Sequence, residues 1–235
     1  MTSSAQSGLA AQRSPLSELW RSVRRERALI TLFDLSRQKS RDLRAARWYA
    51  FGVFVTYALA IGFTGAADRQ QRVQADVRAA LVTLSWVVGA LASLGAARLL
   101  SEHAERDALR GLALQRGFSE GALLRASTLA TAERIARLVG LPTLLLIALG
   151  VARGGTLPWA LMLVPAVLVY VGALSLSLGL LAQLSAELAP RHPRALLAAL
   201  VLCPLLISQA FSAVPSLPGL LSALLSRLLH GAGAA

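Results

Sequence analysis

One short segment gathers side chains of the kinds that bind metals or transfer protons. Residues 102–107 read EHAERD, with a single histidine among four charged residues. A zinc-binding helix of the usual kind pairs two histidines one turn apart, and this segment cannot do so. We therefore interpret the segment as the solvated face of a helix, and we predict no metal, no cofactor and no catalytic residue in this chain.

A chain that hydrolyses ATP itself needs a glycine-rich phosphate loop ending in Gly-Lys-Ser or Gly-Lys-Thr. Lys39 is the only lysine, and Ser40 follows it. Gln38 stands where the last glycine of the loop would be, and Phe33 where the first would be. The chain is therefore not predicted to be an enzyme, and any ATP hydrolysis is expected on a separate partner subunit.

The elements around these residues are dominated by long stretches without Asp, Glu, Lys or Arg, in a chain that is 55% hydrophobic. The uncharged stretches are 48–67, 79–97, 138–152, 154–186 and 195–226. A helix of roughly 20 apolar residues crosses a hydrocarbon core about 30 Å thick. Because a helix also pairs its own backbone polar groups, it is stable there. The pattern predicts an all-α fold: a polytopic helical membrane protein.

The predicted division of the chain follows from these stretches. We expect a disordered terminus at 1–15, a polar outside loop at 68–78 and a charged cytoplasmic region at 101–134. The transmembrane domain covers 48–230, with spans at 48–67, 79–100, 135–152, 157–184 and 195–214. Residues 215–230 are apolar but interrupted by proline, so we favour five spans and a short terminal helix over six spans, and both remain open.

The segment before the first span carries apolar residues at helical spacing. They are Leu16, Leu19, Trp20, Val23, Ile30 and Phe33, with arginines off this stripe. This pattern is typical of an amphipathic helix in the plane of the membrane interface. We predict such an interfacial helix and its connector over 16–47. A soluble helix packed on a partner is the alternative.

The net charge of +12 is unevenly distributed along the chain. Of the 24 basic residues, 19 lie in the first 47 positions, in 98–137 or in 185–194. Arginine-rich loops remain in the cytoplasm, so these three regions and the N-terminus are predicted to be cytoplasmic in a multi-pass protein of the inner membrane. The charge then contacts anionic lipid headgroups, and we predict no nucleic-acid partner.

The predicted span interiors contain no ionisable side chain, which argues against an ion-coupled secondary carrier without excluding one. Polar residues in the spans are candidates for a substrate path, although such residues also serve helix packing. These candidates are Ser85, Ser208, Gln209 and Ser212. Ser175 and Gly179 form a pair of small residues suited to close helix contact. Cys203 is interpreted as a small packing residue.

The cytoplasmic region between spans two and three gives the most specific indication. Its acidic start is followed by the run 109–119, LRGLALQRGFS, and by a second helix leading into span three. Together with the amphipathic helix before span one, residues 16–214 resemble the membrane subunits of ABC-2-type transporters, including the CcmB haem-exporter branch. In that family an interfacial helix precedes span one, and the acidic segment after span two docks into the ATPase subunit.

The resemblance implies a permease subunit of an ATP-driven exporter, working as a homodimer or heterodimer with a separate ATPase. It implies coupling residues in the cytoplasmic region: Glu102, Glu105, Asp107, Leu109, Leu112, Leu114 and Phe118. The alternative interpretation of this region is a solvent-exposed connector between spans two and three. A non-transporting scaffold or assembly subunit is the alternative for the whole chain, and the sequence does not indicate a substrate.

Overall fold

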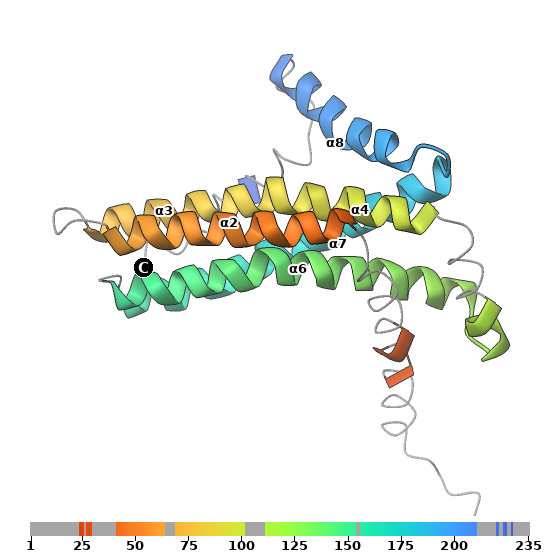
Figure 1. The fold of residues 1–235 in the computed structure, drawn as a ribbon, viewed down its shortest axis with the longest axis horizontal. Helices are drawn as coiled ribbons and strands as arrows, with labels where there is room; N and C mark the ends of the chain where they lie inside the picture. The colour runs from red at the N-terminus through yellow and green to blue at the C-terminus, as the bar shows by residue number, and fades with distance from the viewer. Residues whose placement is uncertain are drawn as a thin grey trace, which may run out of the picture.

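The computed structural model describes residues 24–25, 27–29, 41–63, 69–101, 111–153, 156–210, 220, 223–224 and 227. Within these residues all regular structure is helical and there is no strand. Four long helical segments lie side by side along one axis, and a further helix turns away from them (Figure 1). The helical character predicted from the sequence is confirmed.

The first half of the bundle consists of two antiparallel helical arms. Helix α2 covers Arg41–Phe63. The return arm is one continuous helix made of α3 (Arg69–Thr83), a π-helical turn η1 (Leu84–Val88) and α4 (Gly89–Ser101). At η1 the backbone N–H of Gly89 donates to the carbonyl of Leu84, five residues earlier, so this stretch accommodates one extra residue.

The remaining elements are α6 (Glu120–Ala152), α7 (Leu157–Leu188) and α8 (Pro193–Ala210). We call the end of the bundle where α6 begins the Glu120 end, and the opposite end the Arg153 end. Helices α2 and α6 run towards the Arg153 end, while the α3–α4 arm and α7 run back (Figure 1). Helix α6 packs along both α7 and α2.

Four segments are long and apolar enough to cross a membrane, which is consistent with a multi-pass membrane protein. They are Leu43–Phe63, Gln70–Leu100, Glu120–Ala152 and Leu157–Leu188. The predicted fifth span corresponds to α8, whose described apolar part, Pro193–Cys203, is shorter than these four. The predicted N-terminal segment 1–15, most of 16–47 before Arg41 and most of the predicted terminal helix 215–230 lie outside the described residues.

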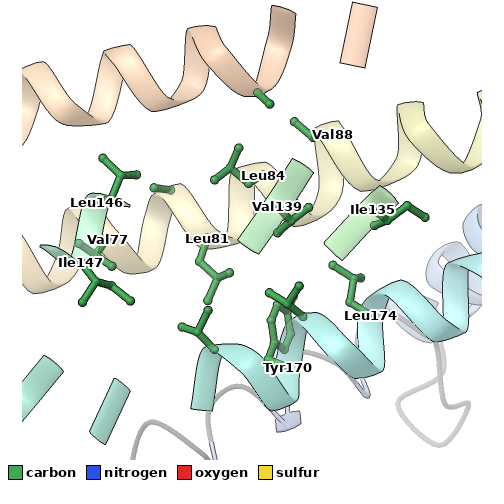
Figure 2. Packing of buried hydrophobic residues seen from close by; sticks show 14 of the residues in the cluster. Val77, Leu81, Leu84, Val88, Ile135, Val139, Leu146, Ile147, Tyr170 and Leu174 are labelled. Carbon is green, nitrogen blue, oxygen red and sulfur yellow. The ribbon is translucent and has the colours of Figure 1, made fainter. Parts of the chain in front are cut away.

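A continuous apolar core fills the centre of the bundle. Its largest buried members come from α2, the α3–η1 arm, α6 and α7, and Figure 2 shows side chains of the last three pointing towards one another. They include Leu81, Leu84, Ile135, Leu146, Tyr170 and Leu174. Buried branched side chains on all four long arms pack them together over most of their length.

The polar outside loop predicted at 68–78 is wrong from Arg69 onward, because α3 begins there. The reason is a stripe of small apolar residues, Val73, Val77 and Ala80, at helical spacing and fully buried against the bundle. The connector before the first span is also partly helical, since α2 begins at Arg41 and buries Leu43 and Ala46. Both segments are rich in polar residues, so the sequence did not indicate that these apolar side chains are buried.

Two glycines allow the long helices to approach closely. A methyl group added at Gly179 of α7 would lie 3.1 Å from the carbonyl oxygen of Thr128 on α6. A methyl group at Gly150 of α6 would lie 2.9 Å from Cγ1 of Val73. Small residues therefore set the spacing of α6 from both neighbours, as is common between membrane helices.

The first turns of helix α8 pack on the bundle. Leu197 is buried among alanines of α4 and α7: Ala96, Ala97, Ala182 and Ala186. Beyond this contact α8 points away from the four long helical segments (Figure 1). The small cluster thus anchors α8 at the Glu120 end of the bundle.

Candidate functional site

The Glu120 end carries a short helical hairpin ahead of α6. Residues 111–115 form a helical turn that ends at Gly117, whose φ of 77° is the left-handed conformation that glycine adopts without strain. Phe118 N–H donates to the Ala113 carbonyl at 3.0 Å, and Gly117 N–H donates to the Leu114 carbonyl at 2.9 Å. This pair of bonds is a Schellman motif, which stops the helix in a fixed geometry.

The next helix starts immediately after this stop. The Ser119 side chain accepts a hydrogen bond from the backbone N–H of Ala122, at 3.2 Å, and so caps α6. Glu120 stands in the first turn, where a negative charge is favourable beside the helix dipole. The sequence Gly117-Phe118-Ser119 therefore makes a defined corner between two helices.

A small apolar cluster holds this hairpin to the N-terminal segment. Leu29, from the helical residues 27–29, is 4% exposed and packs with Ala113 of the hairpin and Leu123 of α6. Phe118 packs against the same cluster from the corner, and Ala126 completes it. The N-terminal segment thus shares one apolar contact with the hairpin and the start of α6, beyond the main core.

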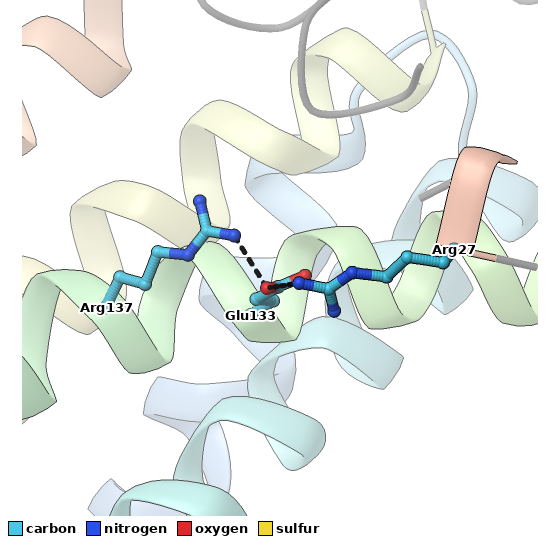
Figure 3. Close-up of polar contacts among 3 residues, drawn as sticks. All are labelled: Arg27, Glu133 and Arg137. Carbon is cyan, nitrogen blue, oxygen red and sulfur yellow. Dashed lines mark hydrogen bonds and ion pairs between the residues drawn. The ribbon is translucent and has the colours of Figure 1, made fainter. Parts of the chain in front are cut away.

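An ionic contact joins the same N-terminal segment to α6. One carboxylate oxygen of Glu133, Oε1, accepts a hydrogen bond from Arg137 at 2.6 Å and another from Arg27 at 3.2 Å (Figure 3). Arg137 lies one turn further along α6, so its approach is the ordinary i,i+4 pair. Arg27 approaches from the other side and adds a tertiary contact.

A chain of polar contacts crosses from α6 to α7 at this end of the bundle. Ser127 donates to the side-chain oxygen of Gln183 at 3.1 Å. The amide nitrogen of Gln183 then donates to Glu187 at 2.9 Å. Buried hydroxyls in the same region bond to the preceding turn of their own helix, as Thr131 does to the Ser127 carbonyl. Polar groups at this end are thereby engaged in holding helices together.

The predicted coupling residues occupy different environments. Leu112 and Leu114 are 56% and 43% exposed on the hairpin, so their side chains are available to a partner. Phe118 is half-buried against the apolar cluster and supports the hairpin from within. Glu102, Glu105, Asp107 and Leu109 lie outside the residues that the structure describes.

The predicted substrate-path residues are described only in part. Ser85 lies in η1 with 0% exposure and donates to the Leu81 carbonyl at 2.6 Å. Ser85 therefore has no exposed surface that could contact a second permease subunit or a substrate between the two subunits. The side chains of Ser208 and Gln209, and the whole of Ser212, lie outside the described part of the chain.

Sequence reasoning missed the contacts that tie the N-terminal segment to the hairpin. The spacing of Glu133 and Arg137 was a visible sign of an ion pair on one helix, and Ser119 before Glu120 was a visible helix cap. The approach of Arg27 and Leu29 had no local signal, because it joins residues about a hundred positions apart.

The arrangement offers a docking surface and helix contacts. Among the described residues, no group of three or more His, Cys, Asp or Glu side chains lies close enough to hold a metal ion. What the Glu120 end presents is a rigid corner with exposed leucines, followed by the exposed Arg125 on α6. Such a surface can bind an apolar groove that has an acidic rim.

Comparison with known proteins gives no relative. No protein-family model matches the sequence, and neither a curated protein nor a solved structure matches it significantly.

Proposed function

We propose that this chain is the membrane-spanning permease subunit of an ATP-driven exporter of the ABC-2 type. In this role it forms the substrate path and receives force from a separate ATPase subunit. The hairpin at the Glu120 end is the observation that carries the proposal. A transporter without an ATPase of its own needs a rigid projection through which a partner can move its spans.

The hairpin has the properties that such a projection requires. Its corner is fixed by the Schellman motif at Gly117 and the cap at Ser119, and it continues directly into α6. Leu112 and Leu114 present apolar surface to solvent. Exposed leucines on a rigid element are suited to burial in a partner's groove, as in helix-in-groove recognition.

Charge supports the orientation that this function needs. Arg24, Arg25, Arg44 and Arg47 are exposed towards the Glu120 end, together with Arg125 on α6. We place this end and the N-terminus in the cytoplasm of the inner membrane, by the positive-inside rule. In this topology α8 is a fifth span, and a homodimer or heterodimer of permeases surrounds the path.

The docking claim is tested by substitution on the hairpin. Co-expression with an ATPase encoded by a neighbouring gene should yield a complex that co-purifies. Leu112→Asp and Leu114→Asp should each release the ATPase, whereas Gln115→Asp adds the same charge to an exposed neighbour and should retain it. Persistence of the complex in both leucine variants, or no ATPase association with the unmodified chain, would refute the proposal.

The orientation is tested with single cysteines in a Cys203→Ser background. An impermeant thiol reagent applied to intact cells should label cysteines at Gln71 and Ala234, but not at Ser101. Labelling at Ser101 would reverse the orientation. Protection of Ala234 alone would indicate a sixth span and a cytoplasmic C-terminus.

A non-transporting membrane scaffold is the second candidate, and the filled centre of the bundle favours it. Ser85 and Tyr170 are both buried, and a continuous apolar core joins α2, the α3–η1 arm, α6 and α7. A scaffold would bind its partners with the same exposed leucines but would not stimulate ATP turnover. Measurement of ATPase activity in a reconstituted complex therefore separates the two roles.

A further inference from the structure

Contacts at the Arg153 end show which residues of α3, α6 and α7 lie at the same position along the bundle axis. A methyl group at Gly150 of α6 would lie 2.9 Å from Val73 of α3 and 3.6 Å from the ring of Trp159 of α7. Val73, Gly150 and Trp159 therefore share one level along the bundle axis. Because α3 and α7 both run from this level towards the Glu120 end, their residues can be compared at equal depth.

At the same position along the bundle axis, the exposed side chains of α3 and α7 differ in polarity. On α3 the exposed side chains between positions 70 and 79 are polar or small: Gln70, Gln71, Arg72, Ala75, Arg78 and Ala79. On α7 they are apolar: Leu157 is 62% exposed and Leu161 66%. No charged residue occurs in α7 before Glu187, so this side offers an uncharged stretch of about 45 Å at 1.5 Å per residue.

The position of the hydrocarbon layer is constrained from the Glu120 end. The ionic contact of Arg27, Glu133 and Arg137 belongs at or beyond the interface, because charges in the layer are costly. Arg137 precedes Gly150 by about 20 Å of helix, and Arg78 lies about 7 Å from the Val73 level towards it. Only about 12 Å of axis therefore separates Arg137 from Arg78.

A hydrocarbon layer about 30 Å thick does not fit between these two arginines. A layer that starts at Arg137 encloses Arg78 and Arg72, together with the half-buried Asp76 of α3. A layer shifted towards the Glu120 end encloses the Glu133 contact instead. On the α7 side the same layer meets one charge, Arg153 at the C-cap of α6, about 24 Å from Arg137 and therefore near the outer surface of the layer. The more deeply placed charges belong to the α3 side.

We propose that the exposed face of α3 from Gln71 to Arg78 lines an aqueous inlet, open at the Arg153 end, within the thickness of the membrane. Gln71, Ala75 and Arg78 are spaced by four and three residues and share one face of the helix. Water along this face solvates the two arginines, which the hydrocarbon layer cannot do. Arg72 and Arg78 make the inlet attractive to small anions.

Water contact is measured by the thiol reactivity of two cysteines in nanodiscs, in which both membrane faces are open to reagent. Ala79→Cys on α3 and Leu161→Cys on α7 are both introduced at exposed sites in a Cys203→Ser background. Counted from the shared level, Ala79 lies about 6 Å deeper than Leu161. The reagent is an anionic, membrane-impermeant methanethiosulfonate.

The inlet predicts that Ala79→Cys reacts at least tenfold faster than Leu161→Cys, although it lies deeper. Both cysteines should react equally after denaturation in SDS. Fast reaction at both sites would mean that this end simply protrudes from the bilayer, and slow reaction at Ala79→Cys would mean that lipid or a second copy seals the face. Either result overturns the proposal.

A second arm tests the anion preference. Arg78→Gln in the Ala79→Cys protein should lower the ratio of anionic to cationic reagent rates by twofold or more, since a positive charge attracts the anionic reagent. An unchanged ratio would overturn the role of Arg78. No ATPase takes part in these measurements, so their failure is distinct from failure of the proposed transport function.

Discussion

The guanidinium of Arg27 meets the carboxylate of Glu133 at 3.2 Å, across 106 positions of sequence. The same carboxylate oxygen accepts from Arg137, so a single acidic residue connects the N-terminal segment to α6. Arg27 and Arg137 are both more than half exposed, and such contacts individually contribute about 1 kcal/mol or less.

Glu133→Gln should loosen the N-terminal segment without unfolding the bundle. The lost ionic contact predicts up to about fivefold faster hydrogen exchange at residues 24–29, the ratio that corresponds to about 1 kcal/mol. Arg116→Gln, an exposed change on the hairpin, is the matched control and should leave this exchange unaltered. Equal exchange in Glu133→Gln and the unmodified protein would show that the contact holds nothing in place.

Leu29→Ala should loosen the hairpin more than Glu133→Gln does. It removes a buried side chain from the cluster that includes Ala113 and Phe118, with a local cost of about 2 kcal/mol. Amide exchange at 111–119 should rise, while that of the core of α7 should not. Ala28→Ser changes the exposed neighbour and is the control. Unchanged exchange at the hairpin would mean that it is held without the N-terminal segment.

Gly117→Ala should destabilise the hairpin corner. A residue with a Cβ pays about 1–2 kcal/mol to adopt the left-handed conformation found at this position. Gly121→Ala serves as the control, since it lies in α6 with open space around it and needs no such conformation. The comparison is made by exchange at 111–119, and equal effects of the two substitutions would contradict the assigned role of Gly117.

Gly179→Ala should lower the melting temperature relative to Gly172→Ala. The methyl group at Gly179 meets the Thr128 carbonyl at 3.1 Å and forces α6 and α7 apart, at a cost of about 1–3 kcal/mol. Gly172 lies on the same helix with nothing within 4 Å, so it isolates the effect of contact from that of helix propensity. Similar melting temperatures for the two variants would show that the crossing tolerates a wider spacing.

The sequence was sufficient where one local signal determined the structure. The uncharged stretch 154–186 corresponds to α7, and the glycine and serine around Phe118 correspond to the hairpin corner. Composition is a weaker guide where a helix is both polar and packed. At 69–78 the charged and amide side chains suggested a loop, although Val73 and Val77 already showed the spacing of a buried stripe.

The candidate site depended on tertiary contacts that no local pattern encodes. Nothing around Leu29 indicates that it packs with Ala113, because the cluster forms only when three segments meet. Ser85 remains a predicted path residue, and its burial and its bond to the Leu81 carbonyl are likewise features that the sequence around it does not indicate. The role of a residue such as Leu29 or Ser85 depends on the side chains that surround it, and these are determined by the whole fold.

The π-helical turn at Leu84–Val88 has an evolutionary consequence. One residue added or removed there would rotate every later position by about 100° around the helix axis. Helix α3 packs on α2 and α6, whereas α4 also packs on α7 and α8, so such a rotation would misalign one half of the arm. Natural selection should therefore conserve the number of residues between Arg69 and Ser101 more strictly than their identities, and homologues should vary here by substitution without gaps.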